Sequence, residues 1–199
     1  SIITKPSEQM EAFNIVIEGG NIISTGILAA EQGTTIEVRN LFFNTPARKK
    51  FLKSDSVELR HIIDVITRYA LGNPNIGFSL SHEGHSLVTA PAVEDAQNKI
   101  ASVYGVALAK DLLPVAFENE FVRVSGYIAK PNQARNDKNQ QVLFVNGRWV
   151  RNVIVNKAIY DGYHSLLFVG KHPVYVLFLE VNPEKVDVNV HPQKSEIKI

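Results

Sequence analysis

The chain has 199 residues, 45% of them hydrophobic, which allows one large domain or two small ones with a substantial core. Lysine and arginine number 21 against 20 acidic residues, so any contact with nucleic acid must come from a local patch rather than from global charge. The sequence has no cysteine, which excludes disulfides, thiolate metal ligands and a cysteine nucleophile, and no apolar run approaches the length of a membrane span.

Strand patterns dominate the first forty residues. Residues 12–18 and 22–30 are strand-like, and Gly19-Gly20 between them supplies a hairpin turn, since glycine reaches positive φ without a steric cost. From Gly33 onward, β-branched residues alternate with polar ones, the period-two pattern of a half-buried strand. We therefore expect a hairpin followed by a further strand.

Two helices are expected next. Asn44 or Thr45 can cap a short helix that begins at Pro46. A longer helix is expected from about residue 56 to residue 71, where Gly72 and the proline after it end the pattern. Five apolar side chains share one face of this helix and should be buried: Leu59, Ile62, Ile63, Ile66 and Ala70.

Pro91 is the expected domain boundary, after a hairpin that turns at Glu83-Gly84. Beyond it, a helix should end near Tyr104, Asn146-Gly147 should form a tight turn, and Asn152 should cap a helix to about residue 165. Strands are expected at residues 113–117, 122–129, 141–145, 174–181 and 186–190, with a polar loop at 130–140. Because strands and helices interleave, an α+β or α/β architecture is predicted.

Three strings of residues together resemble the MutL family of mismatch-repair proteins, and their order and separation match the family. They are Gly33-Thr34-Thr35 running through residues 41–52 (Leu-Phe-Phe-Asn-Thr-Pro-Ala-Arg-Lys-Lys-Phe-Leu), residues 144–148 (Phe-Val-Asn-Gly-Arg) and residues 186–194 (Val-Asp-Val-Asn-Val-His-Pro-Gln-Lys). The resemblance implies an α+β fold in two domains. Residues 1–91 would be the C-terminal part of a GHKL ATPase α/β sandwich, and residues 92–199 a transducer domain with a ribosomal-protein-like, left-handed βαβ fold.

The resemblance also implies what the 199 residues lack. The family's helix with the catalytic glutamate and the magnesium-binding asparagine does not occur in them, nor do its adenine and lid motifs. We therefore expect ATP and Mg²⁺ to be cofactors of a complete protein that is an ATPase, while these residues alone bind no cofactor and have no activity.

Two places resemble nucleotide-binding residues of the family. The lysine that matches Lys194 contacts the γ-phosphate, where a compact ammonium stabilises the terminal phosphate and senses its presence. The alternative is a solvated lysine in a turn after Pro192. Gly33 and Thr34 resemble the last nucleotide motif of the superfamily, in which the hydroxyl helps to bind adenine; the alternative is an ordinary strand start.

Basic residues in two regions are candidates for DNA contact, one region around Trp149 and the other in the polar loop. These residues are Lys130, Arg135, Lys138, Arg148 and Arg151. The alternative is an ordinary solvated surface, whose charge Asp137 dilutes. The cations at positions 48–50 lie near a helix start, where positive charge is mildly unfavourable, so a phosphate or carboxylate partner would explain them.

Metal binding is not predicted. His82, His85 and His191 lack further ligands at a convincing spacing, and His191-Pro192 is interpreted as the structural end of a strand.

The function that the resemblance implies is that of a nucleotide-switched mediator of DNA mismatch repair. ATP binding would bring together the N-terminal regions of two subunits, in a homodimer or a heterodimer. The dimer would engage duplex or single-stranded DNA. It would couple a MutS-type recognition protein to strand excision. The expected location is the cytoplasm, at the nucleoid, in a prokaryote or the nucleus in a eukaryote, with no membrane partner. The alternatives are a gyrase-type topoisomerase, which shares both domain folds, and an interaction module that uses no nucleotide. The strings at 44–48 and 189–194 favour the mismatch-repair interpretation over the gyrase one.

Overall fold

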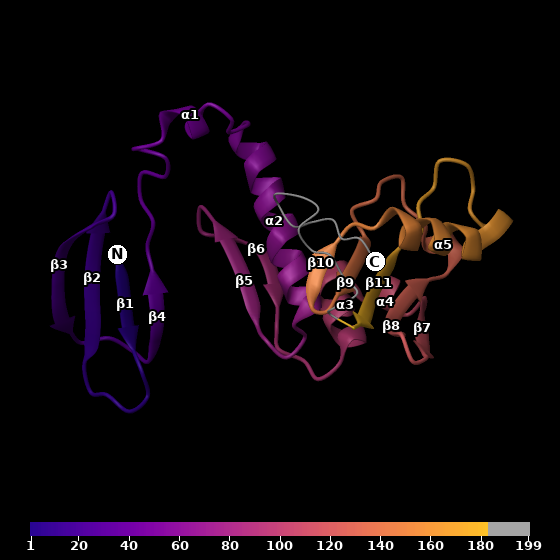
Figure 1. Ribbon diagram of the computed structural model, residues 1–199, viewed down its shortest axis with the longest axis horizontal. Coiled ribbons are helices and arrows are strands. Elements are labelled where there is room, and N and C mark those ends of the chain that lie inside the picture. The colour runs from indigo at the N-terminus through magenta and orange to yellow at the C-terminus, as the bar shows by residue number, and fades with distance from the viewer. Residues whose placement is uncertain (183–199) are drawn as a thin grey trace. The chain divides into compact units, whose positions relative to one another are not determined.

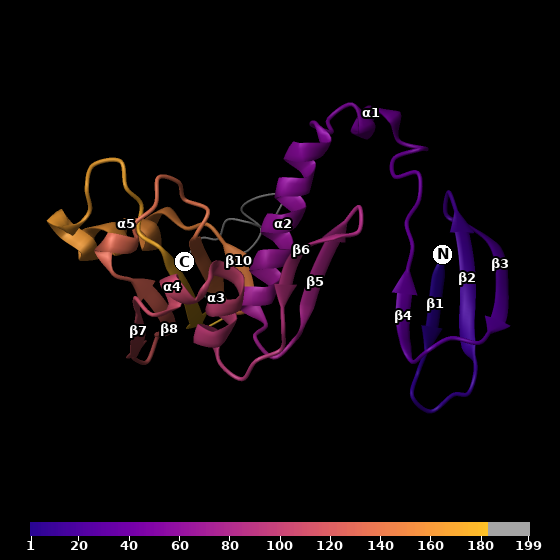
Figure 2. The ribbon, with the colours of Figure 1, turned by 180° about the vertical axis from the view of Figure 1, so that it is seen from behind.

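The computed structural model describes residues 1–182, and contacts divide the chain into two compact units, Ser1–Glu58 and a second that begins at Leu59 (Figures 1 and 2). Both strands and helices are present, which confirms the predicted mixed α and β architecture. Among residues 1–182, no helix is long and apolar enough to cross a membrane.

The first unit is built on a four-stranded antiparallel sheet in the order β3-β2-β1-β4. Its strands are β1 (Ile2–Lys5), β2 (Ala12–Glu18), β3 (Asn21–Leu28) and β4 (Gly33–Ile36). The β2–β3 hairpin and β4 lie where the sequence predicts them. β1 was not predicted, because its apolar residues Ile2 and Ile3 are adjacent and do not alternate with polar ones. It nevertheless lies inside the sheet, where it pairs with both β2 and β4.

Two helices follow this sheet, α1 (Pro46–Lys49) and α2 (Asp55–Gly72). Thr45 is the residue before α1, as predicted, but its side chain makes no capping hydrogen bond. The prediction that one face of α2 is buried is only partly confirmed. Ala70 is fully buried, whereas Ile62 is 47% exposed, because the core of the second unit contacts mainly the C-terminal turns of α2.

The second unit contains a two-stranded hairpin, β5 (Phe78–His82) with β6 (His85–Ala90), and a five-stranded sheet in the order β10-β9-β11-β8-β7. The strands of the larger sheet are β7 (Leu112–Glu118), β8 (Val122–Ala129), β9 (Gln141–Val145), β10 (Arg148–Val150) and β11 (Tyr175–Val181). β9 and β11 are parallel neighbours joined through α5 (Val153–Tyr163), which makes a βαβ unit. The left-handed crossover stays a prediction.

Apolar side chains cover both faces of the larger sheet. On one face, Val142 and Phe144 of β9 pack with Leu71 of α2 and with residues of α3 (Ala96–Tyr104) and α4 (Val106–Ala109). On the other face, Leu143 and Leu177 pack against α5. Both faces are therefore buried, which explains the almost continuous apolar sequence of β11.

Lys99 of α3 is a fully buried charged residue. Its ammonium donates hydrogen bonds to three backbone carbonyls, those of Ile76 at 2.9 Å, Ala90 at 3.3 Å and Pro91 at 2.5 Å. Burial lowers the pKa of Lys99, but the three carbonyls match the three N–H donors of the charged form. These hydrogen bonds link α3 to Ile76, which precedes the hairpin, and to Ala90 and Pro91 at its end. The domain boundary expected at residue 91 lies at this linked end and stays a prediction.

Candidate functional site

The candidate nucleotide residue Thr34 lies on β4, an edge strand of the first sheet. Its register partner on β1 is Thr4, and the two side-chain oxygens are 2.8 Å apart, so one hydroxyl donates a hydrogen bond to the other. Thr34 is exposed and Thr4 is half-buried. The pair is therefore open to solvent on its sheet face, where a ligand can reach it.

Gly33, the other candidate nucleotide residue, begins β4 with a φ of +133° and has no atom within 4 Å of the position a Cβ would occupy. Space does not require glycine there, but the backbone conformation does. The preceding turn is held by Lys5, whose ammonium donates a hydrogen bond of 3.1 Å to the carbonyl of Ala30. Adjacent residues of β1 thus fix the turn and the strand on either side of Gly33.

The sheet face that carries the threonine pair is otherwise apolar. The register places one cross-strand row as Ile27, Phe13, Thr4 and Thr34, and the next row as Thr25, Ile15, Ile2 and Ile36. Phe13 is 46% exposed and Ile36 is 65% exposed. A flat apolar ligand with a polar edge would find hydrophobic contact along these rows and hydrogen-bonding groups at the β4 edge.

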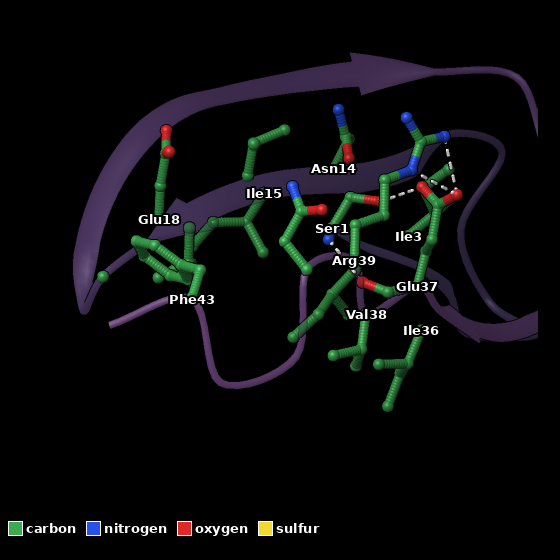
Figure 3. Close-up of a pocket in the computed structure, with 15 residues that line it drawn as sticks. Ser1, Ile3, Asn14, Ile15, Glu18, Ile36, Glu37, Val38, Arg39 and Phe43 are labelled. Atoms are coloured by element: carbon green, nitrogen blue, oxygen red, sulfur yellow. Dashed lines mark hydrogen bonds and ion pairs between the residues drawn. The ribbon is translucent and has the colours of Figure 1, made fainter. Parts of the chain in front are cut away.

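A groove of about 750 Å³ lies beside these rows and is drawn in Figure 3. Ile2, Ile15 and Ile36 line it together with the segment that follows β4. In that segment, Arg39 forms an ion pair of 2.7 Å with Glu37. The Arg39 hydrogen bond holds the pKa of the Glu37 carboxyl below its usual value. Phe43 closes the groove near the hairpin turn at Gly19 (Figure 3). Thr34 is not among the lining residues.

Three consecutive basic residues, 48–50, follow the groove-lining residues in sequence and form the C-terminal end of α1. Arg48, Lys49 and Lys50 are all exposed, so nothing in their burial prevents contact with a phosphate. α1 is only four residues long. A partner for these cations stays a prediction.

Around Trp149, the structure shows a contact that sequence reasoning missed. The Arg68 guanidinium of α2 lies 3.9 Å from the centroid of the indole ring, and the Arg151 guanidinium lies 5.4 Å from it. Arg68 also pairs with Asp64 one helical turn earlier, at 3.8 Å. Burial lowers the pKa of Arg68, Asp64 opposes this effect and Arg151 adds to it. Two guanidiniums thus share one indole, and Asp64 offsets the charge of Arg68.

Several residues of the polar loop before β9 have hydrogen-bond or ion-pair partners. Lys130 forms an ion pair of 3.0 Å with Asp111, so its charge is already matched. Arg135 donates to the side chain of Gln140 at 3.0 Å, and its backbone is bridged to that of His172. Lys138 is exposed. The Lys171 ammonium, beside His172, donates a hydrogen bond of 2.5 Å to the side chain of Asn136. Lys171 is a further cation at this loop and was not among the predicted DNA-contacting residues.

The five candidate DNA residues do not form one cluster. Arg148 pairs with Val145 at the end of β9, whereas Lys138 precedes the start of that strand, so roughly 13 Å of strand separates them. Arg151 follows Val150, whose partner Leu143 is nearer the loop. The structure therefore gives two separate basic groups, one at the edge strand β10 and one in the loop before β9.

Several candidates lie outside the described residues. These are Lys194, His191 and the strand predicted at 186–190. Within residues 1–182, no group of three histidine, aspartate or glutamate side chains is arranged to hold a metal ion, and His82 and His85 each contact the turn residue Glu83.

Comparisons with known proteins cover the whole chain. Residues 100–199 match the family model described as DNA mismatch repair protein, C-terminal domain. The chain is 41% identical over 197 residues to DNA mismatch repair protein MutL of Symbiobacterium thermophilum, covering 99% of this chain and 31% of that protein. It is 42% identical over 184 residues to MutL of Geobacillus thermodenitrificans, covering 92% and 28%. The chain thus spans about a third of the length of these relatives.

Solved structures agree with the sequences. The Aquifex aeolicus MutL ATPase domain complexed with ADP matches with a TM-score of 0.73 and 26% identity, covering 92% of this chain and 67% of that one. The N-terminal domain of a DNA repair protein matches with a TM-score of 0.80 and 27% identity, covering 100% and 65%. The fold is therefore that of a DNA-repair ATPase region of the GHKL type. The chain belongs to the MutL family of DNA mismatch repair proteins.

Proposed function

We propose that this chain is part of a nucleotide-switched DNA mismatch-repair mediator, in which residues 1–91 complete a nucleotide site and residues 92–199 transmit its state. The observation that carries the proposal is the exposed hydroxyl pair of Thr4 and Thr34 at the polar edge of an apolar sheet face. The relative from Aquifex aeolicus with the same fold is an ATPase domain complexed with ADP, which supports a nucleotide as the ligand.

The residues present fit one end of a nucleotide. Thr34 would hydrogen-bond the base, and Gly33 would set the backbone of the strand start. In the complete protein, Thr34→Val should weaken ADP binding by roughly tenfold, the effect of losing one hydrogen bond of about 1.4 kcal/mol. Isothermal titration of the variant checks this, and unchanged ADP affinity would remove Thr34 from the site.

Lys194 is proposed to contact the γ-phosphate of ATP. ATP would supply the terminal phosphate and Mg²⁺ would neutralise part of its charge, while the Lys194 ammonium would stabilise the rest. Lys194→Ala in the complete protein should lower ATP turnover and leave ADP affinity within about twofold, since ADP has no γ-phosphate. Lys171→Ala is the matched control. Equal turnover in both variants would contradict the assignment.

DNA is the proposed partner of the basic surface. Arg148 and Arg151 at β10, and Arg135 and Lys138 in the loop before β9, would contact phosphates. Lys130 would add little, because Asp111 already matches its charge. Each lost phosphate contact should reduce the slope of log affinity against log salt by about 0.9.

The corresponding experiment measures duplex-DNA binding of the complete protein at several salt concentrations. Arg151→Glu should weaken binding and flatten its salt dependence, whereas Lys130→Ala should change both only slightly. If Arg151→Glu changes neither the affinity nor its salt dependence, Arg151 belongs to a solvated surface and not to a DNA interface.

Dimerisation and a MutS-type partner complete the proposal. A terminal phosphate that contacts both domains favours one domain arrangement by contacts that the other arrangement lacks. Addition of a non-hydrolysable ATP analogue to the complete protein should raise its mass to that of a dimer in light scattering, and ADP should not. The proposed location is the cytoplasm, at the nucleoid, as for a DNA-repair protein of bacteria.

A further inference from the structure

Thr4, on β1, lies outside the string that begins at Gly33, yet it is the direct partner of Thr34. The two residues are opposite each other in the antiparallel register, and their hydroxyl oxygens are 2.8 Å apart. We propose that Thr4 is a positioning residue of the nucleotide site, whose hydroxyl fixes the direction in which Thr34 offers its hydrogen bond to the base. This inference rests on the proposed role of Thr34.

The chemistry of the pair explains why a partner is needed. A threonine hydroxyl has one proton and two lone pairs, and on an exposed strand it rotates among several directions. Once Thr4 and Thr34 share a hydrogen bond, the proton of one of them is committed. The remaining proton and lone pairs are then available to a ligand. Less rotational freedom is lost when a ligand binds, which favours binding.

The backbone of Thr34 is held mainly from β1, because β4 is an edge strand and β1 is its neighbour in the sheet. Lys5, the next residue of β1, holds the turn before Gly33 through the carbonyl of Ala30. Thr4 and Lys5 therefore act on successive parts of the same segment, one on the side chain of Thr34 and the other on the turn that leads to it.

The surroundings of the pair indicate a planar, partly apolar ligand group. Phe13 and Ile27 continue the row of Thr4 across the sheet, and Ile2 and Ile36 flank it. A heterocyclic base has an apolar face and a hydrogen-bonding edge. A base that lies over these side chains would present its edge to the two hydroxyls, and a phosphate group would find no such match.

The test uses ADP titrations of the complete protein with four variants. Thr4→Val has nearly the same shape without the hydroxyl, Thr4→Ser keeps a hydroxyl, Thr34→Val removes the direct contact, and a double variant combines the two valines. Thr25→Val, on the same sheet face but outside the pair, is the matched control. Valine is favourable in strands, so folding is expected to persist and is checked by thermal melting.

Thr4→Val should weaken ADP binding about three- to tenfold, the range of one hydrogen bond. Thr4→Ser should stay within about twofold of the parent protein, and the double variant should be no weaker than Thr34→Val alone, because both changes remove one coupled unit. Competition by inorganic tripolyphosphate, which has no base, should be unchanged in Thr4→Val.

Three outcomes would overturn the inference. Unchanged ADP affinity in Thr4→Val, with weaker binding in Thr34→Val, would leave the proposed function standing and remove Thr4. Equal weakening of ADP and tripolyphosphate would indicate a distorted sheet and no positioning of the base. Unchanged affinity in Thr34→Val would instead remove the nucleotide role on which the inference rests.

Discussion

The Arg68 guanidinium lies over the Trp149 ring at 3.9 Å from its centroid, so a cation–π contact joins α2 to β10. Such a contact, partly shielded from water, contributes about 1 kcal/mol. Arg68→Met should lower the free energy of unfolding by about that amount, measured by urea denaturation with the fluorescence of the chain's single tryptophan. Arg60→Met, at an exposed position of the same helix, should have little effect. Equal losses in the two variants would mean that helix propensity, and not the ring contact, is measured.

Removing the Lys99 ammonium should have a larger effect. Lys99→Met keeps most of the apolar volume but leaves the carbonyls of Ile76, Ala90 and Pro91 without their donor. Unsatisfied buried polar groups cost about 1–3 kcal/mol each, so for three carbonyls a loss of at least roughly 3 kcal/mol is expected. The midpoint of urea unfolding measures it, with Lys157→Met on the exposed side of α5 as the control. A Lys99→Met variant as stable as the parent protein would contradict the stabilising role of the ammonium.

Gly126 is the position in β8 where a side chain cannot be added. Its φ is +125°, and a Cβ there would lie 2.2 Å from the carbonyl oxygen of Val176 on β11. Gly126→Ala should therefore force β8 and β11 apart and lower the stability by about 1–3 kcal/mol. Gly26 on β3 has no atom within 4 Å of its Cβ position and no positive φ, so Gly26→Ala is the matched change without a clash. Thermal melting of the two variants should differ clearly.

Acid stability should depend on Asp111. Hydrogen bonds from Lys130 and then from Gln133 hold the pKa of this carboxyl below its ordinary value of 3.8. A carboxyl with a lowered pKa in the folded state stabilises the fold above its unfolded pKa, and this contribution is lost as the pH falls below about 4. Asp111→Asn should reduce stability at pH 7 and make the difference between pH 7 and pH 3 smaller. An identical pH dependence in both proteins would show that the ion pair is fully screened.

Element positions in the second unit were largely predictable from local patterns. Residues 122–129 and 141–145 form strands with the predicted bounds, because alternation and turn residues delimit them. α4 and β10 were missed, because segments of four and three residues show no period. The order of the strands could not be predicted, since β9, β11 and β8 are brought together by packing over long sequence separations.

A candidate site could be proposed from the sequence only where a motif carries it. The string at Gly33 and Thr34 predicts a nucleotide contact, which stays a prediction, and nothing local indicates that Thr4 is the register partner of Thr34 from 30 residues away. The DNA candidates were chosen by charge, and charge alone cannot show that Asp111 already neutralises Lys130. Lys99 was missed for a similar reason, because a lysine is normally assigned to the surface.

The position of β11 in the middle of the larger sheet has a consequence for synthesis on the ribosome. β7, β8, β9 and β10 leave the ribosome before β11, yet β8 and β9 can be joined into one sheet only through it. Until residue 181 has emerged, the nascent chain carries two separate hairpins with apolar, unpaired strand edges. Such edges are sites of aggregation, so slow translation just upstream of β11 should prolong the dependence of this protein on chaperones.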